Sequence, residues 1–368
     1  MPLILERKAS SGEPVKVLVY DSVLHYVCDV SKKFGIQSAA FFTHCATTCT
    51  IFYQLHDGTL KSPLQDEPAE TISLSSVPCE LKPKDLPSLI YDPGSYPSLL
   101  RATLNQSLNF HHADWIFLNS FDSLELQAVS WMASYCPNVK TIGPTIPSIY
   151  LDKSLKDDKD YGLSLFNPET HACKQWLDTK AKGAVAYASF GSMASLSGEQ
   201  MEEIAWGFAN SRCYFLWVVR ASEESKLPKN FAAQVGEKGL IVKWCSQLEV
   251  LAHDAVGCFL THCGWNSTVE ALSLGVPMVV LPQWNDQPTN AKLIVDVWQT
   301  GLRLEAGEDG IVRRDEVEIG IREAIVGDGA VELKKNAAKW KDLAKEAMSE
   351  GGSSYKNIEQ FVSSIGTK

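Results

Sequence analysis

The chain has 368 residues and a formal net charge of −10 at pH 7, and this length allows two domains of ordinary size. Hydrophobic residues make up 45% of the chain and charged residues 21%, as in soluble globular proteins. The negative charge argues against a nucleic acid as partner, and no apolar run is long enough to span a bilayer. Ten cysteines are scattered without a regular framework, which favours a reducing cytosol over a disulfide-bonded fold.

The first part of the chain alternates short apolar runs with amphipathic segments. Residues 1–14 are mostly polar and are expected to be irregular. Strands are predicted at Val15–Tyr20 and Ile36–Phe42, with the helix His25–Phe34 between them. This order is that of a βαβ unit, in which ligands meet the carboxyl tips of the strands. The remaining predicted elements are the helix Thr43–His56, the long loop Leu60–Pro97, and the strands Trp115–Asn119 and Val139–Ile142.

The second part continues the alternation after a polar linker. The linker holds Asp158-Lys159-Asp160, which is interpreted as a solvated segment because no strand precedes it. The predicted strands are Ala184–Ser189, Tyr214–Val219, Leu240–Lys243, Val256–Thr261 and Met278–Leu281. The predicted helices are Cys173–Asp178, Ser197–Asn210, Trp265–Leu274, Val312–Val326, Val331–Met348 and Ser353–Ile365. The alternation predicts an α/β fold with parallel sheets.

The stretch from Trp244 to Gln287 is expected to bind a nucleotide joined to a sugar. His262 follows a predicted strand, and Asn266 and Ser267 open the helix that comes next. The free backbone N–H groups at the start of a helix attract phosphate. His262-Cys263-Gly264 is expected to be a turn with one flexible residue. His262 can offer a pyrophosphate a hydrogen bond or a positive charge.

Other side chains at the same sheet edge suit the rest of such a ligand. The carboxylate of Glu270, about one helical turn further along, can accept from both hydroxyls of a ribose. The indole of Trp244 at a strand tip can stack on a flat base, and Gln247 can then meet the base or ribose edge. Asp286 and Gln287 suit the hydroxyls of a hexose. Taken alone, a tryptophan is usually in the core and a helical glutamate usually faces solvent. It is the order of all these residues together that indicates a binding site.

This order of residues resembles the signature box of plant secondary-product UDP-glycosyltransferases, glycosyltransferase family 1. That box spans forty-four residues from its first tryptophan to its last glutamine, as Trp244 to Gln287 does here. The resemblance implies a GT-B fold of two Rossmann-like doubly wound domains, inversion at the anomeric carbon, and no metal or other cofactor. The implied domains are an acceptor-binding domain, 1–147, a linker, 148–164, a UDP-sugar-binding domain, 165–348, and a helix, 349–368, that crosses back to the first domain.

The resemblance also implies a set of donor contacts. Those expected to hold the uridine are Trp244, Gln247 and Glu270. Those expected to hold the phosphates are Ser192, His262, Asn266 and Ser267, with Gly264 and Trp265 shaping the turn. Those expected to face the sugar are Trp284, Asp286 and Gln287. In this family a closing glutamine goes with glucose, which makes UDP-glucose the expected donor. Asn285 stands where Thr or Ser is more usual, and the departure is expected to be mild.

On the acceptor side, Asp21 follows the first predicted strand. A helix cap is the ordinary interpretation, whereas the resemblance makes it the aspartate that orients a catalytic histidine. That histidine lies upstream in the family, so the chain is expected to be truncated at its N-terminus and to lack the opening strands and helix of the first domain. His25 and His44 are not expected to replace it. His44, with Thr43, is expected to line the acceptor pocket.

Two function classes stay open. The first is transfer of glucose to the hydroxyl or carboxylate of a plant secondary metabolite or hormone. The alternative is a catalytically impaired UDP-sugar-binding fragment that lacks the family's catalytic histidine. A nicotinamide dehydrogenase is disfavoured, because no Gly-x-Gly-x-x-Gly follows a predicted strand. The expected partners are the UDP-sugar and a small-molecule acceptor, bound by a cytoplasmic monomer.

Overall fold

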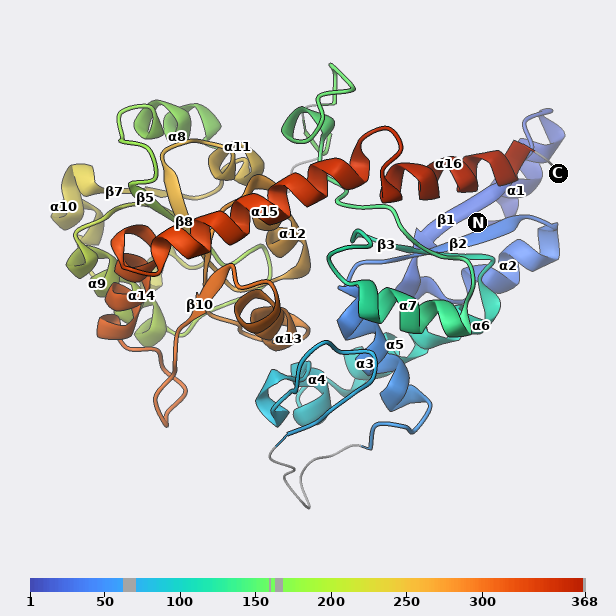
Figure 1. Cartoon of the computed structure of the whole chain (residues 1–368), viewed down its shortest axis with the longest axis horizontal. Coiled ribbons are helices and arrows are strands. Elements are labelled where there is room, and N and C mark those ends of the chain that lie inside the picture. The colour runs from blue at the N-terminus through green and yellow to red at the C-terminus, as the bar shows by residue number, and fades with distance from the viewer. Residues whose placement is uncertain (62–70, 159, 163–167, 367–368) are drawn as a thin grey trace. The chain divides into compact units, whose positions relative to one another are not determined.

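The computed structural model describes residues 1–61, 71–158, 160–162 and 168–366 (Figure 1). The chain divides into two compact units: Met1–Thr145 together with Ala344–Lys368, and Ile146–Leu343. The start of the second domain predicted at residue 165 lies outside the described residues. The described part of the predicted linker, 148–164, belongs to the second unit. Both units are α/β with parallel sheets, as predicted.

The first unit is built on a parallel sheet in which the strand order follows the chain, β1-β2-β3-β4. Its strands are β1 (Val17–Asp21), β2 (Gln37–Phe42), β3 (Trp115–Leu118) and β4 (Val139–Thr141). Its helices are α1 (Pro2–Ser10), α2 (Val27–Phe34), α3 (Ala46–His56), α4 (Ser88–Tyr91), α5 (Pro97–Asn105), α6 (Asn109–His112), α7 (Leu126–Tyr135) and α16 (Ser353–Gly366). Its 3₁₀ turns are η1 (Ser22–Leu24), η2 (Pro83–Asp85) and η3 (Gln106–Leu108). The predicted strands are confirmed to within two residues at each end.

The opening residues are helical, so the prediction of an irregular segment over 1–14 is wrong. Pro2 occupies the first helical position of α1, where its missing N–H costs nothing. Arg7 and Lys8 lie in the last turn and complement the helix dipole. Leu5 is buried and attaches the helix to the rest of the unit.

Helix α3 begins three residues later than predicted because its N-terminus is capped from a distant part of the chain. The buried carboxylate of Glu125 accepts from the backbone N–H groups of Ala46 at 3.0 Å and Thr47 at 2.9 Å. Ser120 Oγ also donates to it, at 2.7 Å. Burial raises the pKa of this carboxyl group. Glu125 also stands at the N-terminus of α7, but its side chain makes no cap there.

The last helix, α16, packs against the sheet of the first unit. Ser354 Oγ donates to the backbone carbonyl of Gly143 at 2.6 Å. The Phe361 ring meets Phe117 edge-on, with centroids 4.7 Å apart, and Trp115 at 5.5 Å. These contacts bury one side of the helix on β3 and hold the C-terminal segment to this unit.

The second unit has a parallel sheet in the order β10-β9-β8-β5-β6-β7. Its strands are β5 (Val185–Ser189), β6 (Tyr214–Val218), β7 (Gly239–Val242), β8 (Val256–Thr261), β9 (Met278–Val280) and β10 (Gly301–Arg303). Its helices are α8 (Thr170–Leu177), α9 (Gly198–Ser211), α10 (Phe231–Val235), α11 (Gln247–Leu251), α12 (Trp265–Leu274), α13 (Gln287–Lys292) and α14 (Arg314–Val326). Helix α15 (Ala330–Met348) begins in this unit, and its last residues belong to the first unit. Shorter turns are η4 (Ser148–Tyr150), η5 (Glu224–Lys226), η6 (Gly236–Lys238) and the π-helical η7 (Leu293–Val297).

The strand order of this sheet reverses between β5 and β8. From β5 the chain adds β6 and β7 on one side, and from β8 it adds β9 and β10 on the other. In open parallel sheets the crevice at such a reversal, outside the carboxyl ends of the strands, is where ligands bind. The loops that follow β5 and β8 therefore mark the candidate site.

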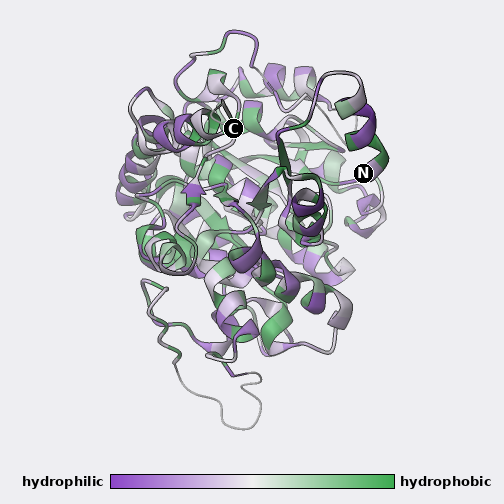
Figure 2. Cartoon of the chain, turned by 90° about the vertical axis from the view of Figure 1, so that its right-hand side faces the viewer, coloured by the Kyte–Doolittle hydropathy of each residue, from purple (hydrophilic) through white to green (hydrophobic). Residues whose placement is uncertain are grey.

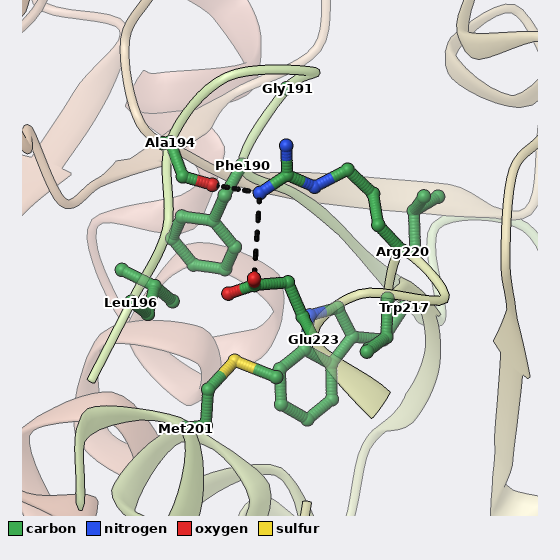
Figure 3. A pocket seen from close by; sticks show the side chains of 10 residues that line it. Phe190, Gly191, Ala194, Leu196, Met201, Trp217, Arg220 and Glu223 are labelled. Carbon is green, nitrogen blue, oxygen red and sulfur yellow. Dashed lines mark hydrogen bonds and ion pairs between the residues drawn. The ribbon is translucent and has the colours of Figure 1, made fainter. Parts of the chain in front are cut away.

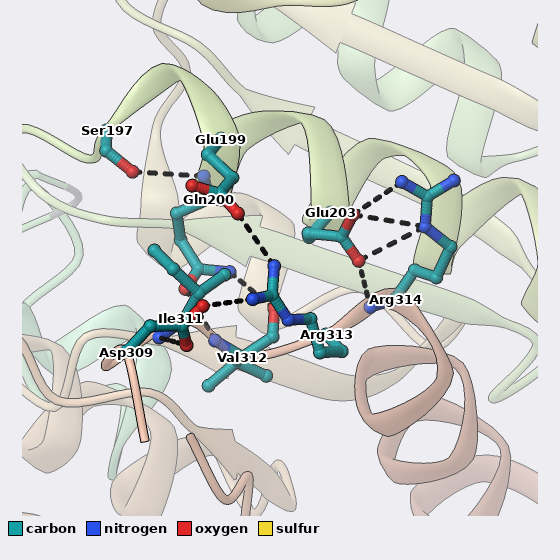
Figure 4. A network of polar contacts seen from close by, with 9 residues as sticks. All are labelled: Ser197, Glu199, Gln200, Glu203, Asp309, Ile311, Val312, Arg313 and Arg314. Carbon is teal, nitrogen blue, oxygen red and sulfur yellow. Dashed lines mark hydrogen bonds and ion pairs between the residues drawn. The ribbon is translucent and has the colours of Figure 1, made fainter. Parts of the chain in front are cut away.

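Helix α14 is tied to α9 on one face of this sheet by paired polar contacts (Figure 4). The Gln200 side chain donates to the carbonyl of Val312 and accepts from its N–H, both at 2.9 Å. The Glu203 carboxylate accepts from the backbone N–H of Arg314 at 2.6 Å and from its guanidinium. These contacts fix the segment between β10 and α14, so the two helices form a rigid support for the sheet.

The strands of both units are rich in hydrophobic residues, and many helices carry hydrophobic and hydrophilic residues together (Figure 2). In the second unit Phe208, Phe215 and Trp217 are nearly inaccessible and form part of one apolar cluster. None of the helices in the described ranges combines the length and the apolarity that a membrane crossing requires.

Candidate functional site

The turn between β8 and α12 is held in a left-handed conformation at Cys263, which has a φ of 67°. Such a φ is unfavourable for a residue with a side chain and persists only where the surroundings enforce it. Here the Cys263 N–H donates to Thr261 Oγ1 at 3.1 Å, and its carbonyl accepts from Asn290 Nδ2 at 2.8 Å. The turn is therefore fixed before any ligand arrives.

Gly264 does not supply the flexible backbone that the sequence suggested, because its φ is −58°. A glycine is needed at this position for a steric reason instead. A Cβ at Gly264 would lie 2.6 Å from Nε2 of His262, closer than any real contact allows. A Cβ at Gly191, in the loop after β5, would lie 2.8 Å from the same nitrogen. The imidazole of His262 thus fits between two glycine backbones at the reversal of the strand order.

His262 is 9% exposed, and burial lowers its pKa to about 4. Of the two contributions predicted for His262, burial therefore favours the hydrogen bond over the positive charge. A neutral imidazole has one donor and one acceptor nitrogen. His262 can contribute a hydrogen bond at this site, and its role toward a phosphate stays a prediction.

The N-terminus of α12 faces the same crevice. Its N-cap is Gly264, which has no side chain to cap the first turn. Asn266 is exposed and Ser267 is nearly buried. Helix α12 has ten residues, and its uncapped N-terminus favours an anion next to its first N–H groups. The predicted phosphate residues of β8 and α12 are therefore brought together, with Ser192 in the neighbouring loop after β5.

Glu270 is buried, and both of its carboxylate oxygens accept hydrogen bonds. Gln247 Nε2 donates to Oε2 at 2.6 Å, and Tyr161 Oη donates to Oε1 at 2.8 Å. Gln247 Nε2 also donates to Ser267 Oγ at 2.9 Å. Burial raises the pKa of Glu270. The carboxylate can receive two hydroxyls only if these donors rearrange.

Tyr161 was missed by the sequence analysis. It lies in the polar segment before α8, far along the chain from the signature box, and only its position as an aromatic residue among polar neighbours sets it apart. Tyr161 is 53% exposed, but its hydroxyl reaches Glu270, and the shielding of that hydroxyl and then the carboxylate raise the pKa of Tyr161. Tyr161 occupies a hydrogen-bonding position on the carboxylate that the sequence predicts for a ribose hydroxyl.

The two tryptophans near the predicted uridine side differ in burial. Trp244 follows β7, is half-buried, and its carbonyl accepts from the Glu169 N–H at 2.8 Å. Trp265 is 3% exposed and packs against Trp298, with ring centroids 6.1 Å apart. Trp244 therefore keeps surface on which a base can stack, whereas Trp265 supports the start of α12 from the core.

The residues predicted to face a sugar lie between β9 and α13. Oε1 of Gln287 accepts from the backbone N–H groups of Gln283 at 2.9 Å and Trp284 at 3.0 Å. Because a carbonyl oxygen has two lone pairs, Gln287 is oriented so that a sugar would meet its amide nitrogen. Asp286 accepts from Asn290 Nδ2 at 2.7 Å.

Asn285, the departure from the family pattern, has a φ of 57°. Asparagine tolerates this left-handed conformation better than most residues with a side chain, and β-branched threonine tolerates it poorly. The backbone of this turn therefore accommodates Asn285 without further change.

The acceptor-side residues lie at strand tips of the first unit. Asp21 is exposed at the end of β1 and accepts from the Val23 N–H at 3.0 Å, so it caps η1. This is the ordinary interpretation of Asp21, and its catalytic role stays a prediction. Thr43 is exposed and His44 half-buried directly after β2. The His44 ring lies 6.0 Å from that of Phe52. The acceptor-pocket role of Thr43 and His44 also stays a prediction.

Among the residues that the structure describes, no three His, Cys, Asp or Glu side chains are placed so that they could hold a metal ion.

Comparisons with known proteins extend these observations. A family model described as "UDP-glucoronosyl and UDP-glucosyl transferase" matches residues 156–312. UDP-glycosyltransferase 74E2 of Arabidopsis thaliana is 47% identical over 364 residues, which cover 99% of this chain and 80% of that protein. UDP-glucosyltransferase 74AE2 of Panax ginseng is 48% identical over 363 residues, covering 98% and 79%. The crystal structure of Os79 from O. sativa in complex with UDP superimposes with a TM-score of 0.93 at 38% identity, covering 99% and 81%.

Proposed function

The chain belongs to the plant UDP-glycosyltransferase family, and on that premise we propose that it transfers glucose from UDP-glucose to a small-molecule acceptor with inversion at the anomeric carbon. The GT-B fold predicted for it is confirmed by the likeness to Os79. The observation that supports the proposal best is the crevice between β5 and β8. There the N-terminus of α12, a neutral His262 and the buried carboxylate of Glu270 lie along one sheet edge.

The proposed donor pose follows the order of these groups. The base stacks on Trp244, and the ribose hydroxyls donate to Glu270. The diphosphate lies at the N-terminus of α12 and beside the loop after β5. The hexose extends toward Gln287, whose amide oxygen already accepts from two backbone N–H groups, which leaves its amide nitrogen as the group that can donate to a sugar. Glucose is proposed as the sugar from the closing glutamine and from the name of the Panax ginseng relative.

The proposed reaction is a single displacement. The acceptor oxygen forms a bond to the anomeric carbon while the bond from that carbon to the β-phosphate oxygen breaks. The acceptor's proton passes to a base, and UDP leaves with the electrons of the broken bond. Negative charge grows on the diphosphate, where the fixed N–H groups of α12 and a hydrogen bond from His262 stabilise it. We propose that Asp21 is the member of the family's His–Asp pair that this sequence carries, and no histidine of the sequence is predicted to replace its partner.

We propose a plant secondary metabolite or hormone with a free hydroxyl or carboxylate as the acceptor. We also propose that the chain acts as a monomer in the cytoplasm and uses no metal or other cofactor. All ten cysteines are free thiols in the structure, which is what a reducing compartment maintains.

The proposal is tested by two measurements on the whole chain. Calorimetry with UDP-glucose measures donor binding, and product analysis after incubation with phenols and carboxylic acids measures transfer. A β-configured glucoside supports inverting transfer, and an α-configured product contradicts it. Binding without transfer to any acceptor supports the alternative, a donor-binding protein without activity. Absence of UDP-glucose binding overturns both.

Replacing Tyr161 by phenylalanine is expected to tighten UDP binding by about threefold to tenfold. The Tyr161 hydroxyl bonds to Glu270 at 2.8 Å, and a ribose that binds there has to displace it at a net loss of about 1 kcal/mol. Calorimetry with UDP measures the change. Tyr150, a second tyrosine of this segment, gives the control replacement by phenylalanine. Weaker binding by the Tyr161 variant would show that the hydroxyl supports the ligand instead of competing with it.

Replacing Gly191 by alanine is expected to weaken UDP binding by at least about tenfold. The added methyl would lie 2.8 Å from His262 Nε2, and the φ of 71° is unfavourable for alanine. The loop or the imidazole has to move, and either shift changes the phosphate end of the site. Gly198 to alanine is the control, because a Cβ there meets nothing within 4 Å. Equal UDP affinity of the two variants would contradict the expectation.

A further inference from the structure

The loop from Phe190 to Leu196, which joins β5 to α9, is held by a side chain from the neighbouring strand. Arg220 follows the end of β6, and its guanidinium donates to the backbone carbonyls of Ser192 and Ala194. Figure 3 shows the contact with Ala194. Arginine is suited to this task because its planar group presents several N–H donors in a fixed geometry. One side chain thereby fixes two carbonyl directions in the loop that carries Ser192.

Two further charged residues complete the contact with this loop. Glu223 lies 3.9 Å from the Arg220 guanidinium and accepts from Ser195 Oγ at 3.1 Å. Lys226 lies 2.7 Å from Glu223 and donates to the carbonyl of Leu196 at 2.7 Å. We call Arg220, Glu223 and Lys226 the loop clamp. Together its members contact the loop at Ser192, Ala194, Ser195 and Leu196.

The loop clamp is largely shielded from solvent and carries a net positive charge. The exposed fractions of its side chains are 16% for Arg220, 13% for Glu223 and 28% for Lys226. Two cations and one carboxylate leave a single uncompensated positive charge, which solvent screens less here than at a fully exposed position. An ordinary surface ion pair adds little to stability, but this arrangement acts on backbone groups of a specific loop.

The loop that the clamp holds reaches the crevice between β5 and β8. Gly191 lies against the imidazole of His262, so close that a Cβ would meet Nε2 at 2.8 Å. The positive charge of Arg220 also contributes to the lowered pKa of His262, after the larger effect of burial. Arg220 is therefore electrostatically coupled to the phosphate end of the site without belonging to it.

We propose that Arg220, Glu223 and Lys226 are positioning residues for the diphosphate of the donor. They hold the Gly191–Ser192 backbone beside His262 and add positive charge close to this end of the site. This inference rests on the proposed function, since it concerns the phosphate end of the same donor site. It assigns a task to residues outside the signature box, and none of the three needs to touch the substrate.

Replacing Arg220 by methionine tests the proposal with two ligands, UDP and uridine. Methionine retains much of the apolar stem and removes the donors and the charge. We expect UDP affinity to fall by about tenfold, in line with the loss of charged hydrogen bonds worth about 1.5 kcal/mol, while uridine affinity changes less than about twofold, since uridine has no phosphate. A lysine at position 220 keeps the charge but not the planar donors, so an intermediate loss of UDP affinity is expected.

Replacement of Lys226 provides a second variant, which is less prone to misfold. Alanine at this position is expected to weaken UDP binding by about threefold, consistent with a loss under 1 kcal/mol from a partly exposed cation, and to leave uridine binding unchanged. Lys229 to alanine is the matched control, because it removes the same charge from an exposed position three residues further on. The kcat and KM for UDP-glucose, measured for each variant, separate ground-state binding of the diphosphate from transition-state stabilisation.

The outcomes are distinct. Equal loss of UDP and uridine affinity in the Arg220 and Lys226 variants would overturn the proposal, since a clamp that merely stabilises the fold affects both ligands. Unchanged UDP affinity in both variants would overturn it as well. If the unsubstituted chain bound neither UDP nor UDP-glucose, the proposed function itself would fail, and that result differs from either of the others.

Discussion

Replacing Glu270 by alanine is expected to weaken UDP binding by about a hundredfold, because two hydrogen bonds to a carboxylate are worth about 3 kcal/mol together. The carboxylate is buried in α12, so a ribose hydroxyl that meets it is shielded from competing water. No other carboxylate belongs to the residues predicted to hold the uridine. The loss should therefore exceed that of any other single replacement in the donor site.

The ligand series distinguishes this effect from that of the loop clamp. Uridine and UDP carry the same ribose, so the Glu270 variant should lose affinity for both by a similar factor. A 2′,3′-dideoxy analogue of UDP cannot donate to the carboxylate, and the variant should bind it as well as the unsubstituted chain does. Glu249 to alanine is the matched control, because Glu249 is an exposed carboxylate on the adjacent helix α11. Calorimetry measures all of these affinities.

Glutamine at position 270 provides the control for folding. Alanine leaves the donors Gln247 and Tyr161 without their present acceptor, and each lost hydrogen bond destabilises the fold by about 1 kcal/mol. Glutamine keeps one acceptor oxygen and the size of the side chain. If the alanine variant bound UDP with unchanged affinity while remaining folded, Glu270 would have no part in ribose binding, and the proposed donor pose would be wrong.

The sequence determined the central elements of the second unit closely, and the reason is physical. Strand β8 and helix α12 have the bounds predicted for them. Val256–Thr261 is an apolar run of strand length, and the helix ends at Gly275, whose φ of 73° is that of a left-handed helix cap. Local signals of this kind are strong because each depends on a few neighbouring residues.

What the sequence did not predict depends on contacts between distant residues. Strand β10 has only three residues and is recognisable only through its pairing with β9. The capping of α3 by Glu125 joins positions 78 and 79 residues apart. The contact of Tyr161 with Glu270 spans 109 residues. None of these leaves a periodicity or a motif in the chain itself.

The turn after β8 also has a backbone conformation that the sequence did not predict. A His-Cys-Gly sequence suggests that glycine takes the unusual backbone conformation, yet Cys263 has the positive φ and Gly264 does not. The reason lies in side chains that the sequence does not bring together. Thr261 and Asn290 hold Cys263 in place, and the His262 ring excludes a Cβ at Gly264. Gly264 therefore shapes this turn for a steric reason, and not through the backbone freedom that the sequence suggested.

Acid should destabilise the second unit through His262, and the His262→Gln variant should lack that part of the acid sensitivity. The folded-state pKa is about 4, against about 6.5 in an unfolded chain. Above the unfolded pKa the imidazole is neutral in both states and folding stability is unaffected. As the pH falls from about 6.5 to about 4, the unfolded chain takes up a proton that the folded chain does not, so the free energy of unfolding decreases.

The expected loss between pH 7.5 and pH 4.5 is about 2.5 kcal/mol, from the two pKa values and 1.36 kcal/mol per unit. Glu125 and Glu270 act in the opposite sense, because their raised pKa means that the folded state binds a proton more readily than the unfolded state. The comparison between the unsubstituted chain and the His262→Gln variant cancels these contributions. Replacement of His112, which is exposed at the end of α6, by glutamine is the control.

Urea unfolding at the two pH values, followed by tryptophan fluorescence, measures the difference. The unsubstituted chain and the His112 variant should lose about 2.5 kcal/mol more than the His262 variant does over this interval. In parallel, the imidazole resonance of His262 should not shift between pH 8 and about pH 5.5, since protonation there is under a tenth complete. A ring that titrates near its ordinary pKa of about 6.5 would show that a protonated imidazole is accessible near neutral pH, and the loop clamp would then not be the sole source of positive potential.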